Sequence, residues 1–352
     1  MRGLKEWKLD PLRDTDPAGI GDFTLLARLG QGGMGRVYLA ESRAGQRVAL
    51  KVMLAISDDA RRRERFGREV EMLRSAVGVS IANYADDGTM EDVPWLATEY
   101  VPGPTLERRV RDHGPLRGAA LAMLGASLAE GLGHIHRAGL LHRDFKPPNV
   151  VLGPGGPKII DFGLAVDSEG LGRFTATGMV AGTAAWMAPE QAAGERDLTP
   201  AIDIYALGAV MAYGANGKTP SPRATPSCAG LTPPLAAVVS GMLADEPRDR
   251  PTAPEVREAM LSIVGDDVAG TLRGLVSDTY GRYTTVDPPP VRPAPPAPPA
   301  PPASAEASGE PTVLADPTVL VPMPRTRHRP SQERAAKAAQ LLRTAYAPSK
   351  EL

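Results

Sequence analysis

The sequence predicts an α+β globular domain followed by a tail that cannot build a core. Apolar segments around a glycine-rich turn, residues 23–39, have the pattern of two strands joined by a loop, and residues 48–52 form a third strand-like run. The charged segment 58–74 carries an apolar stripe typical of a helix. From residue 288 to residue 302, ten of fifteen residues are proline, which favours extended polyproline II over a packed fold.

Composition narrows the class of protein before any motif is considered. The chain has 352 residues, a net charge of −1 and 42% hydrophobic residues. It has enough apolar residues to form a large core, and its net charge does not indicate binding to nucleic acid. A single cysteine rules out an internal disulfide and suits a reducing compartment. Residues 1–19 read as an N-terminal extension without a signal peptide. The longest apolar stretch, residues 204–215, is too short for a membrane span, so we expect a cytoplasmic protein.

The first segment of the domain carries a glycine-rich loop. Gly30, Gly32 and Gly35 follow one apolar run and precede another that begins at Val37. Dinucleotide-binding folds use the same glycine spacing, but there a helix follows the loop, whereas here a second strand follows. Glycines allow a backbone to close over phosphate oxygens without a Cβ clash. The loop therefore predicts phosphate binding, with a plain glycine-rich hairpin as the alternative.

The third strand contains one charge, Lys51, in the middle of the run Val-Ala-Leu-Lys-Val. A lysine in a buried strand needs an anionic partner, which nucleotide phosphates or a carboxylate on the next helix could supply. Glu69 is the favoured carboxylate because it lies between Phe66 and Val70 on the apolar side of that helix. Glu64 and Glu71 are the competing candidates.

The richest chemistry lies in two neighbouring loops. Residues 142–149 read His-Arg-Asp-Phe-Lys-Pro-Pro-Asn, and Asp161-Phe-Gly follows twelve positions later. Together they supply a proton acceptor, a cation for a phosphate and two oxygen ligands for a hard divalent metal. Phosphoryl transfer from ATP requires this combination of positioning and charge neutralisation.

With these residues the chain resembles the eukaryotic-like serine/threonine protein kinases of bacteria. The resemblance covers residues 20–265, the expected kinase domain, and implies a bilobal fold with a small β-rich lobe carrying one main helix, a larger helical lobe, and ATP in the cleft between them. Its motifs stand in the order typical of the family: Gly30-x-Gly-x-x-Gly35-x-Val37, Val48-Ala-Leu-Lys51, Glu69, His142-Arg-Asp-x-Lys-x-x-Asn149, Asp161-Phe-Gly163, Ala188-Pro-Glu190, Asp203 and Arg250.

The resemblance assigns a role to each of these positions. It implies that Asp144 is the catalytic base, that Lys146 contacts the transferring phosphate, and that Thr183 contacts both. Asn149 and Asp161 would bind Mg²⁺, with Mn²⁺ as an alternative metal. It further implies a Lys51–Glu69 pair at the ATP phosphates, a buried Glu190–Arg250 pair, an Asp203 that anchors the catalytic loop, and a packed His142.

The same resemblance implies an adenine site. The backbone of Glu99 and Val101 would bind the base, after a small residue, Thr98, at the gatekeeper position. The apolar residues expected around the ring are Leu29, Val37, Ala49 and Val151.

A switch is expected between the two motifs Asp161-Phe-Gly and Ala188-Pro-Glu. Thr175 and Thr177 lie one residue apart in this segment, and Arg143 beside the catalytic Asp144 is a ready cationic partner for a phosphate. We therefore expect autophosphorylation at Thr175 and Thr177, against the alternative that both are plain polar loop residues.

The rest of the chain departs from the family pattern or extends it. The segment at residues 221–230 is shorter than usual in the family and contains prolines. A helix that is usual in the family at this place is therefore expected to be lost. We expect a connecting segment at 266–287, a disordered proline-rich linker at 288–330 and a short helix or tail at 331–352. Pro-Thr-Val-Leu occurs twice, from residues 311 and 317, and suggests a phosphothreonine-binding or Pro-rich-motif-binding partner.

The predicted function is Mg-ATP-dependent phosphorylation of serine and threonine residues on protein substrates in intracellular signalling. Two alternatives remain. A pseudokinase scaffold would lack Lys51, Asp144 or Asp161, and all three are present. A small-molecule kinase would lack the Ala-Pro-Glu motif and the threonine-bearing loop, and both are present.

Overall fold

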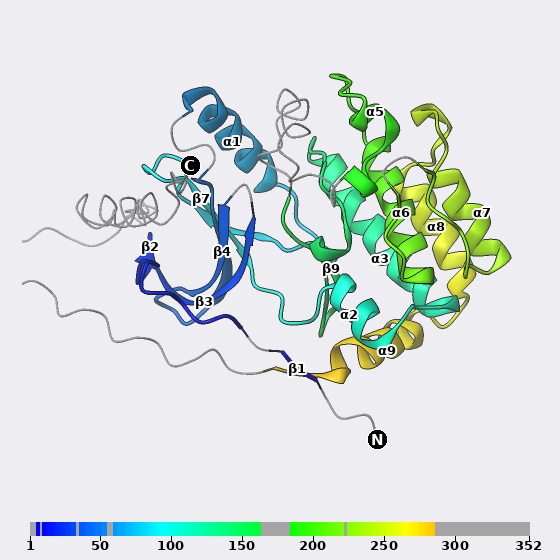
Figure 1. The fold of residues 1–352 in the computed structure, drawn as a ribbon, viewed down its shortest axis with the longest axis horizontal. Coiled ribbons are helices and arrows are strands. Elements are labelled where there is room, and N and C mark those ends of the chain that lie inside the picture. Colours follow the sequence, from blue (N-terminus) through cyan, green and yellow to red (C-terminus); the bar gives the residue numbers. More distant parts are fainter. Residues whose placement is uncertain are drawn as a thin grey trace, which may run out of the picture.

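The protein folds into two lobes, one built mainly from strands and one from helices (Figure 1). The structure is a computed structural model and describes residues 5–7, 9–32, 35–54, 59–162, 184–221 and 224–285. In Figure 1 the small lobe holds β2, β3, β4, β7 and α1, and the large lobe holds the helices from α3 to α8. The predicted bilobal α+β architecture is confirmed.

The small lobe is built on a six-stranded sheet with the order β2-β3-β4-β5-β7-β6. Its neighbouring strands all pair antiparallel. Side chains alternate between the two faces of a strand, and Tyr38, Leu50 and Trp95 point into a buried cluster on one face. The strands are β2 Gly19–Ile20, β3 Phe23–Gly32, β4 Gly35–Glu41, β5 Arg47–Val52, β6 Tyr84–Asp87 and β7 Trp95–Glu99.

Helix α1, Ala60–Leu73, joins the sheet to the large lobe. It begins where the Asp59 carboxylate accepts a hydrogen bond from the backbone of Arg62, which satisfies one free amide of the first turn. Phe66, Val70 and Leu73 recur at helical spacing and are buried in the cluster that fills the large lobe. The helix predicted over residues 58–74 is therefore present, with its apolar stripe turned inward.

The large lobe is a helical bundle whose two central helices are buried. Helix α3 packs against α6, α8 and α9, and 13 of its 20 residues are buried. Helix α6 is apolar almost all round, as a helix in the centre of a bundle must be. The helices are α2 Leu106–His113, α3 Gly118–Arg137, α5 Pro189–Ala192, α6 Ala201–Asn216, α7 Pro233–Met242, α8 Ala253–Val264 and α9 Val268–Thr279.

The connection from α6 to α7 contains no helix in the parts that the structure describes, residues 217–221 and 224–232. Gly217 ends α6 in a left-handed conformation, with φ of 71°, and its amide donates to the carbonyl of Tyr213. The loss of a helix here, predicted from the prolines of this segment, is confirmed for the described residues.

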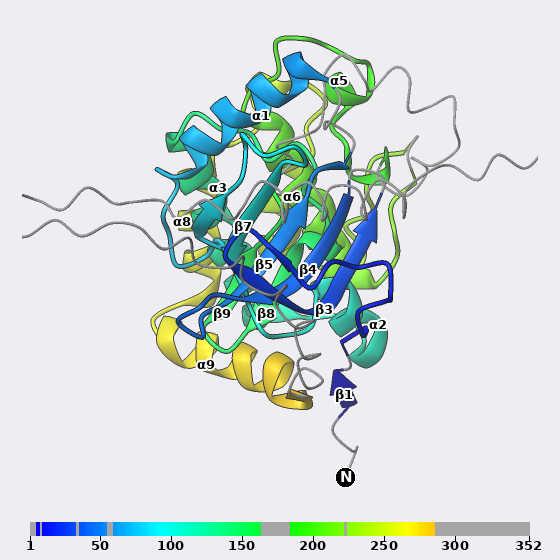
Figure 2. The same ribbon diagram turned by 90° about the vertical axis from the view of Figure 1, so that its left-hand side faces the viewer.

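Two short pairs of strands complete the fold. Strands β8, Val150–Gly153, and β9, Gly156–Ile159, form an antiparallel hairpin directly after the catalytic loop. Strands β1, Lys5–Trp7, and β10, Tyr283–Thr285, pair in parallel and bring the start of the described chain to its end. Figure 2 shows β1 below the sheet and α9 at the base of the large lobe.

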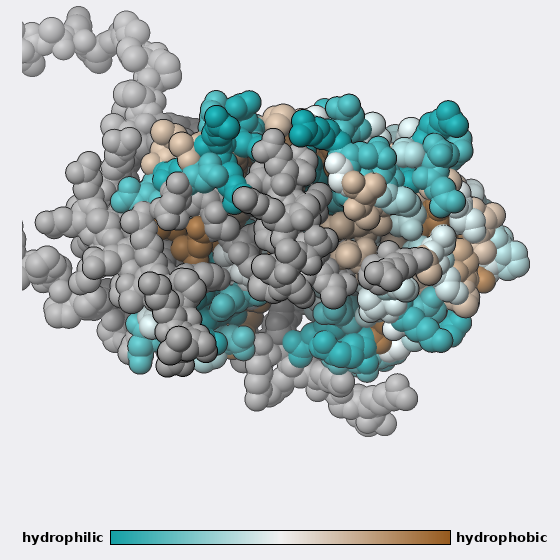
Figure 3. All heavy atoms as spheres, turned by 45° about the horizontal axis from the view of Figure 1, so that its top comes forward, coloured by the Kyte–Doolittle hydropathy of each residue, from teal (hydrophilic) through white to brown (hydrophobic). Residues whose placement is uncertain are grey.

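The visible surface is mixed in character. On the face in Figure 3 the described residues are mostly hydrophilic, with small scattered apolar areas, which is normal for a folded domain. Among the helices that the structure describes, none combines the length and the apolar character needed to cross a membrane.

Candidate active site

One buried carboxylate, that of Asp203, fixes the catalytic loop, which comprises residues 142–149. Asp203 lies in the first turn of α6, is 1% exposed, and accepts hydrogen bonds from the backbone amides of His142 at 2.8 Å and Arg143 at 3.0 Å. His136 from α3 contacts the same carboxylate at 2.8 Å. Burial alone would raise the pKa of Asp203, but the hydrogen bond from His136 and the neighbouring histidines lower it. The predicted anchoring role of Asp203 is confirmed.

The loop held in this way brings three predicted site residues together. The Lys146 ammonium lies 2.8 Å from a carboxylate oxygen of Asp144. The side-chain amide of Asn149 donates to the Asp144 backbone carbonyl at 2.8 Å and to its carboxylate at 3.3 Å. A side-chain amide that donates through nitrogen keeps its oxygen as the remaining ligand atom. Asp144 can therefore accept a proton while Asn149 offers a hard oxygen to a cation.

The second half of the site comes from β5 and from the end of β9, where the Ile160 amide donates to the Asn149 carbonyl of the catalytic loop at 2.9 Å. The Lys51 ammonium forms an ion pair with the Asp161 carboxylate, across 110 positions of sequence. Asp161 and Arg143 are the two non-glycine residues with positive φ in the described chain, at 57° and 62°. Such backbone conformations cost free energy and concentrate at functional sites. The structure thus places the predicted metal ligand beside the predicted phosphate contact.

The expected Lys51–Glu69 pair is not the contact that the structure shows. Glu69 instead forms ion pairs with Arg143 at 3.0 Å and with Arg65 at 3.3 Å. Burial raises the pKa of Glu69, and the two arginines only partly oppose this. A buried carboxylate needs a cation, and with Lys51 held by Asp161 the arginine of the catalytic loop supplies it. Sequence reasoning could not select between two cations that lie so far apart in the chain.

The glycine-rich loop connects β3 and β4 as predicted. The position of Gly35 cannot accept a side chain, because its φ is 155° and a Cβ atom would overlap the backbone of Val52 on the neighbouring strand. A Cβ at Gly30 or Gly32 would meet nothing within 4 Å. The described residues therefore leave open space beside the backbone at Gly30 and Gly32.

The residues expected around adenine come from both lobes. Leu29 packs against the same buried cluster as Tyr100, which lies in the hinge segment that follows β7, and Val101 and Val151 share a second cluster. In the sheet Ala49 stands opposite Thr98, and Val37 stands opposite Lys51. The Glu99 side chain turns to Lys158, 2.7 Å away, which leaves its role at the adenine to its backbone. The structure brings the set to one junction; its contact with a nucleotide stays a prediction.

A buried ion pair braces the large lobe near the site. Arg250 donates to both carboxylate oxygens of Glu190, at 2.6 and 2.9 Å, and its side chain is fully buried. Bidentate geometry of this kind gives a strong charge-assisted bond. His142 is also fully buried, stacked edge-on against Phe145. Both predictions, the buried pair and the packed histidine, are confirmed.

One contact of the site was missed from the sequence. The side-chain amide of Gln191 donates to the backbone carbonyl of Arg143 at 2.7 Å and so ties the catalytic loop to α5. Its only signal in the sequence is its place directly after Ala188-Pro-Glu190. Thr175, Thr177, Thr183 and Gly163 lie outside the described residues.

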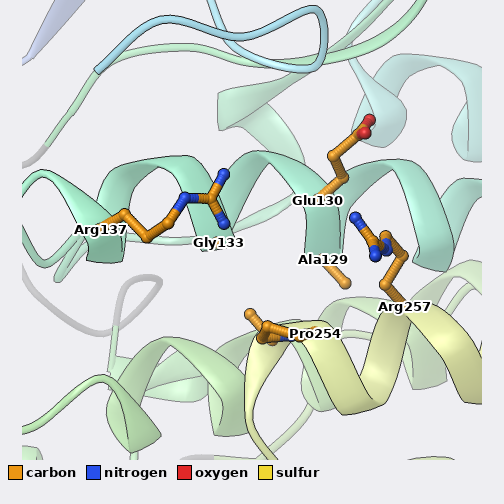
Figure 4. A pocket seen from close by; sticks show the side chains of 7 residues that line it. Ala129, Glu130, Gly133, Arg137, Pro254 and Arg257 are labelled. Carbon is orange, nitrogen blue, oxygen red and sulfur yellow. The ribbon is translucent and has the colours of Figure 1, made fainter. Parts of the chain in front are cut away.

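A small cavity between α3 and α8 lies away from this chemistry (Figure 4). Its volume is about 10 Å³, and Glu130, Arg137 and Arg257 stand around it. A space of that size is at the lower limit for a single water molecule. We regard it as a packing defect between two helices.

Comparison with known proteins agrees with the geometry. The protein kinase domain family matches residues 23–261, more than half of the chain. The chain is 46% identical over 215 residues to a probable serine/threonine-protein kinase, PkwA, of Thermomonospora curvata, covering 60% of this chain and 28% of that protein. It is also 46% identical over 219 residues to the serine/threonine-protein kinase AfsK of Streptomyces coelicolor, covering 62% and 27%. It therefore spans less than a third of the length of these relatives.

The fold has a solved counterpart. A crystal structure of the Mycobacterium tuberculosis PknI kinase domain matches with a TM-score of 0.57 and 30% identity, over 70% of this chain and 98% of that one. Together with the order of the motifs and the anchored catalytic loop, these likenesses establish that the chain belongs to the protein kinase family, among the eukaryotic-like serine/threonine kinases of bacteria.

Proposed function

We propose that this protein transfers the γ-phosphoryl group of Mg-ATP to serine and threonine hydroxyls of protein substrates. The observation that carries the proposal is the catalytic loop itself. Asp203 holds its backbone, Lys146 and Asn149 both contact Asp144, and the Lys51–Asp161 pair offers a second cation and a second oxygen donor. A kinase site needs a positioned base, a cation at the moving phosphate and metal ligands, and these residues supply each of them.

The residues divide the reaction between them. The Asp144 carboxylate orients the substrate hydroxyl and takes its proton as the new oxygen–phosphorus bond forms and the bond to ADP breaks. Lys146 lies within 2.8 Å of Asp144 and can follow the transferring group, while Lys51 neutralises the nucleotide phosphates. Asn149 and Asp161 are the oxygen donors that would hold Mg²⁺, which offsets the phosphate charge when bound.

The reaction is tested with the wild type and Asp144→Asn, each incubated with labelled Mg-ATP and a generic basic protein. We expect label transfer from the wild type and a decrease of at least about 100-fold in the variant, because asparagine cannot accept the proton. Asp22→Asn is the control, since that carboxylate makes an exposed ion pair with Arg43 in the small lobe. Chelation of the metal should stop transfer, and Mn²⁺ in place of Mg²⁺ shows whether the site accepts either.

The same experiment separates the alternatives. Nucleotide binding without transfer would favour a pseudokinase scaffold and overturn the proposal. Transfer to a small molecule but never to protein would favour a small-molecule kinase. The contacts of Lys51, Asp161, Lys146 and Asp144 and the buried Glu190–Arg250 pair of the Ala-Pro-Glu motif support the protein kinase.

We also propose that autophosphorylation at Thr175 and Thr177 rearranges the site. Arg143, the predicted cation for a phosphothreonine, is engaged by Glu69 at 3.0 Å. A phosphate carries nearly two negative charges and would compete for this guanidinium. Glu69 would then be released toward Lys51, which gives the two arrangements of a switch.

Mass spectrometry after incubation with Mg-ATP should find phosphate on Thr175, Thr177 or both. The double variant Thr175→Ala, Thr177→Ala should then phosphorylate the basic protein at least several-fold more slowly than the wild type. A fully active double variant, or a wild type with neither threonine modified, would contradict the switch.

The remaining predictions concern the setting of the activity. A cytoplasmic signalling role and a partner for the two Pro-Thr-Val-Leu segments stay predictions, and those segments lie outside the described residues. Phosphorylation of Thr312 or Thr318, followed by binding of a phosphothreonine-reading domain to the modified chain, is the measurement that bears on the partner.

A further inference from the structure

Residues that precede the family match form a strap along the small lobe. We use the word strap for β1 together with residues 9–20. Leu9 packs against the buried cluster of Leu26, Ala27 and Leu39, as Leu29 and Tyr100 also do. The Arg28 amide donates to the carbonyl of Asp10 at 2.8 Å. The strap therefore runs beside β3, the strand that leads into the glycine-rich loop at residues 30–35. We call this loop the phosphate loop.

The centre of the strap is a fully buried carboxylate, Asp16. It accepts hydrogen bonds from Arg28 Nε at 2.6 Å, from Arg36 Nη1 at 2.6 Å and from the Tyr38 hydroxyl at 2.7 Å. The Asp16 side chain is 0% exposed, and those of Arg28 and Arg36 are 5% and 4% exposed. A charge cluster withdrawn from water to this degree is held in a narrow range of geometry, because each lost contact would leave a buried charge without compensation.

The three donors stand on the two strands that flank the phosphate loop. Arg28 is two residues before Gly30 on β3, and Arg36 directly follows Gly35 on β4. Gly30 and Gly32, between these arginines, contribute no side chain to hold the loop, and a Cβ at either position would meet nothing within 4 Å. The position of the loop over the phosphates is therefore set where its two strands are held.

The far end of the strap is fixed to the large lobe. β1 pairs with β10, and the Tyr283 hydroxyl of β10 lies 3.3 Å from the carboxylate of Asp112 on α2. Just before β10, Asp278 forms an ion pair at 2.9 Å with Arg109 of α2, which is 3% exposed. Figure 1 shows β1 next to the end of α9, between the two lobes. The strap thus connects the lobes a second time, beside the hinge.

We propose that Asp16 is a positioning residue for ATP, which acts through Arg28 and Arg36 on the phosphate loop, and that β1 fixes this loop relative to the large lobe. This inference rests on the proposed function for its kinetic consequence. Asp16, β1 and β10 lie outside residues 23–261, the part that the family accounts for, whereas their partners Arg28, Arg36 and Asp112 lie inside it.

The test compares the wild type, Asp16→Asn and the control Asp22→Asn in the full chain. Binding of Mg-ATP is measured by calorimetry, and KM for ATP and kcat are measured with the basic protein. Asp16→Asn should weaken ATP binding and raise its KM about tenfold, with kcat at saturating ATP within about twofold of the wild type, because the amide keeps the shape and loses the charge. Asp22→Asn should match the wild type in both constants.

Two further variants make the test independent of one substitution. Tyr38→Phe removes one donor to Asp16 and should weaken ATP binding about threefold. A chain that starts at residue 9 lacks β1 but keeps Asp16, and should show a similar loss. Amide exchange of residues 28–32 and 35–38 should be faster in each of these variants than in the wild type.

Unchanged ATP affinity in a folded Asp16→Asn protein would overturn the positioning role. This holds even if kcat and the melting temperature fall, because those changes alone would indicate a purely structural role. If Asp16→Asn does not fold, wild-type affinity in Tyr38→Phe decides against the role. Wild-type affinity in the shortened chain would remove the part assigned to β1. A wild type that binds ATP but transfers no phosphate would refute the proposed function. The ATP-binding and amide-exchange measurements would still test whether Asp16 and β1 position the phosphate loop.

Discussion

At the scale of single residues, the site depends on carboxylates whose partners are fixed by burial. Asp203 holds the catalytic loop, Glu190 holds Arg250, and Asp16 holds two arginines beside the phosphate loop. Each of these carboxylates is largely withdrawn from solvent and accepts hydrogen bonds from at least two donor groups of the protein. Removal of one partner therefore costs more than the bond itself, because it leaves a charge buried without compensation.

The Glu190–Arg250 pair gives the clearest prediction for stability. Arg250→Met leaves the Glu190 carboxylate buried without its cation and should lower the free energy of unfolding by about 3–5 kcal/mol. Urea denaturation of the purified variants measures the change. The matched control is Arg257→Met on α8, whose ion pair with Glu258 is exposed and should be worth less than about 1 kcal/mol. Equal destabilisation by both variants would contradict the account.

Residue motifs predicted most of the site, and they did so for a physical reason. Asp144, Lys146 and Asn149 lie within six positions, so a single anchored loop must bring them together. Glu69 has a different partner in this structure from the predicted one, because two cations compete for it and the outcome depends on the position of a whole helix. No local pattern encodes that position.

At the scale of elements, the boundary between hinge and large lobe leaves no room for a side chain. Gly103 has φ of 149°, and a Cβ there would collide with the carbonyl oxygen of Leu152 on β8. The neighbouring Leu152 amide donates to the Pro104 carbonyl at 2.9 Å, so the two segments cannot separate without the loss of a buried bond. Residues 103–104 therefore lie close against β8, the strand that carries Val151 of the predicted adenine site.

Gly103→Ala should accordingly lower stability by about 2 kcal/mol or more and weaken ATP binding, since both the collision and the backbone conformation oppose it. Thermal melting with and without Mg-ATP measures both effects. Gly155→Ala in the turn between β8 and β9 is the control, because a Cβ there meets nothing within 4 Å and its φ is ordinary. A Gly103→Ala protein that melts and binds like this control would refute the expectation.

Elements with strong periodicity were predicted well, and irregular ones were not. The strands around the glycine-rich loop and helix α1 formed where the apolar pattern placed them. The strap carries no such pattern. Its fold depends on Asp16 meeting Arg28 and Arg36, which are 12 and 20 positions away, and on β1 meeting a strand at the other end of the described chain.

At the scale of the whole molecule, stability should fall in acid. Burial alone would raise the pKa of Asp16, but hydrogen bonds from Arg28, the Arg13 backbone and Tyr38 lower it from 3.8 to about 2. A carboxyl with a lowered pKa stabilises the fold above its unfolded pKa and loses that contribution as pH falls through its folded value. The pKa values of Asp203 and Asp278 are also lowered, whereas the pKa of Glu69 is raised.

The free energy of unfolding, measured in urea between pH 7 and pH 2, should therefore decrease below about pH 4, and Asp16 should account for roughly 2 kcal/mol of the decrease. In Asp16→Asn the acid-dependent part should be smaller by that amount. An identical slope in the variant and the wild type would show that Asp16 does not titrate in this range.

The parallel pairing of β1 with β10 also determines how the molecule would respond to force. Lys5 stands beside Tyr283, and Trp7 stands beside Thr285, so the chain enters the pair at one end and leaves it at the other. Tension between the two ends of the chain would therefore load this pair in shear, with its hydrogen bonds strained together. An antiparallel pair with both ends on one side would open like a zipper, one bond at a time. Until the strands part, the β1–β10 pair would therefore carry the tension itself and shield the rest of the strap and the phosphate loop from it.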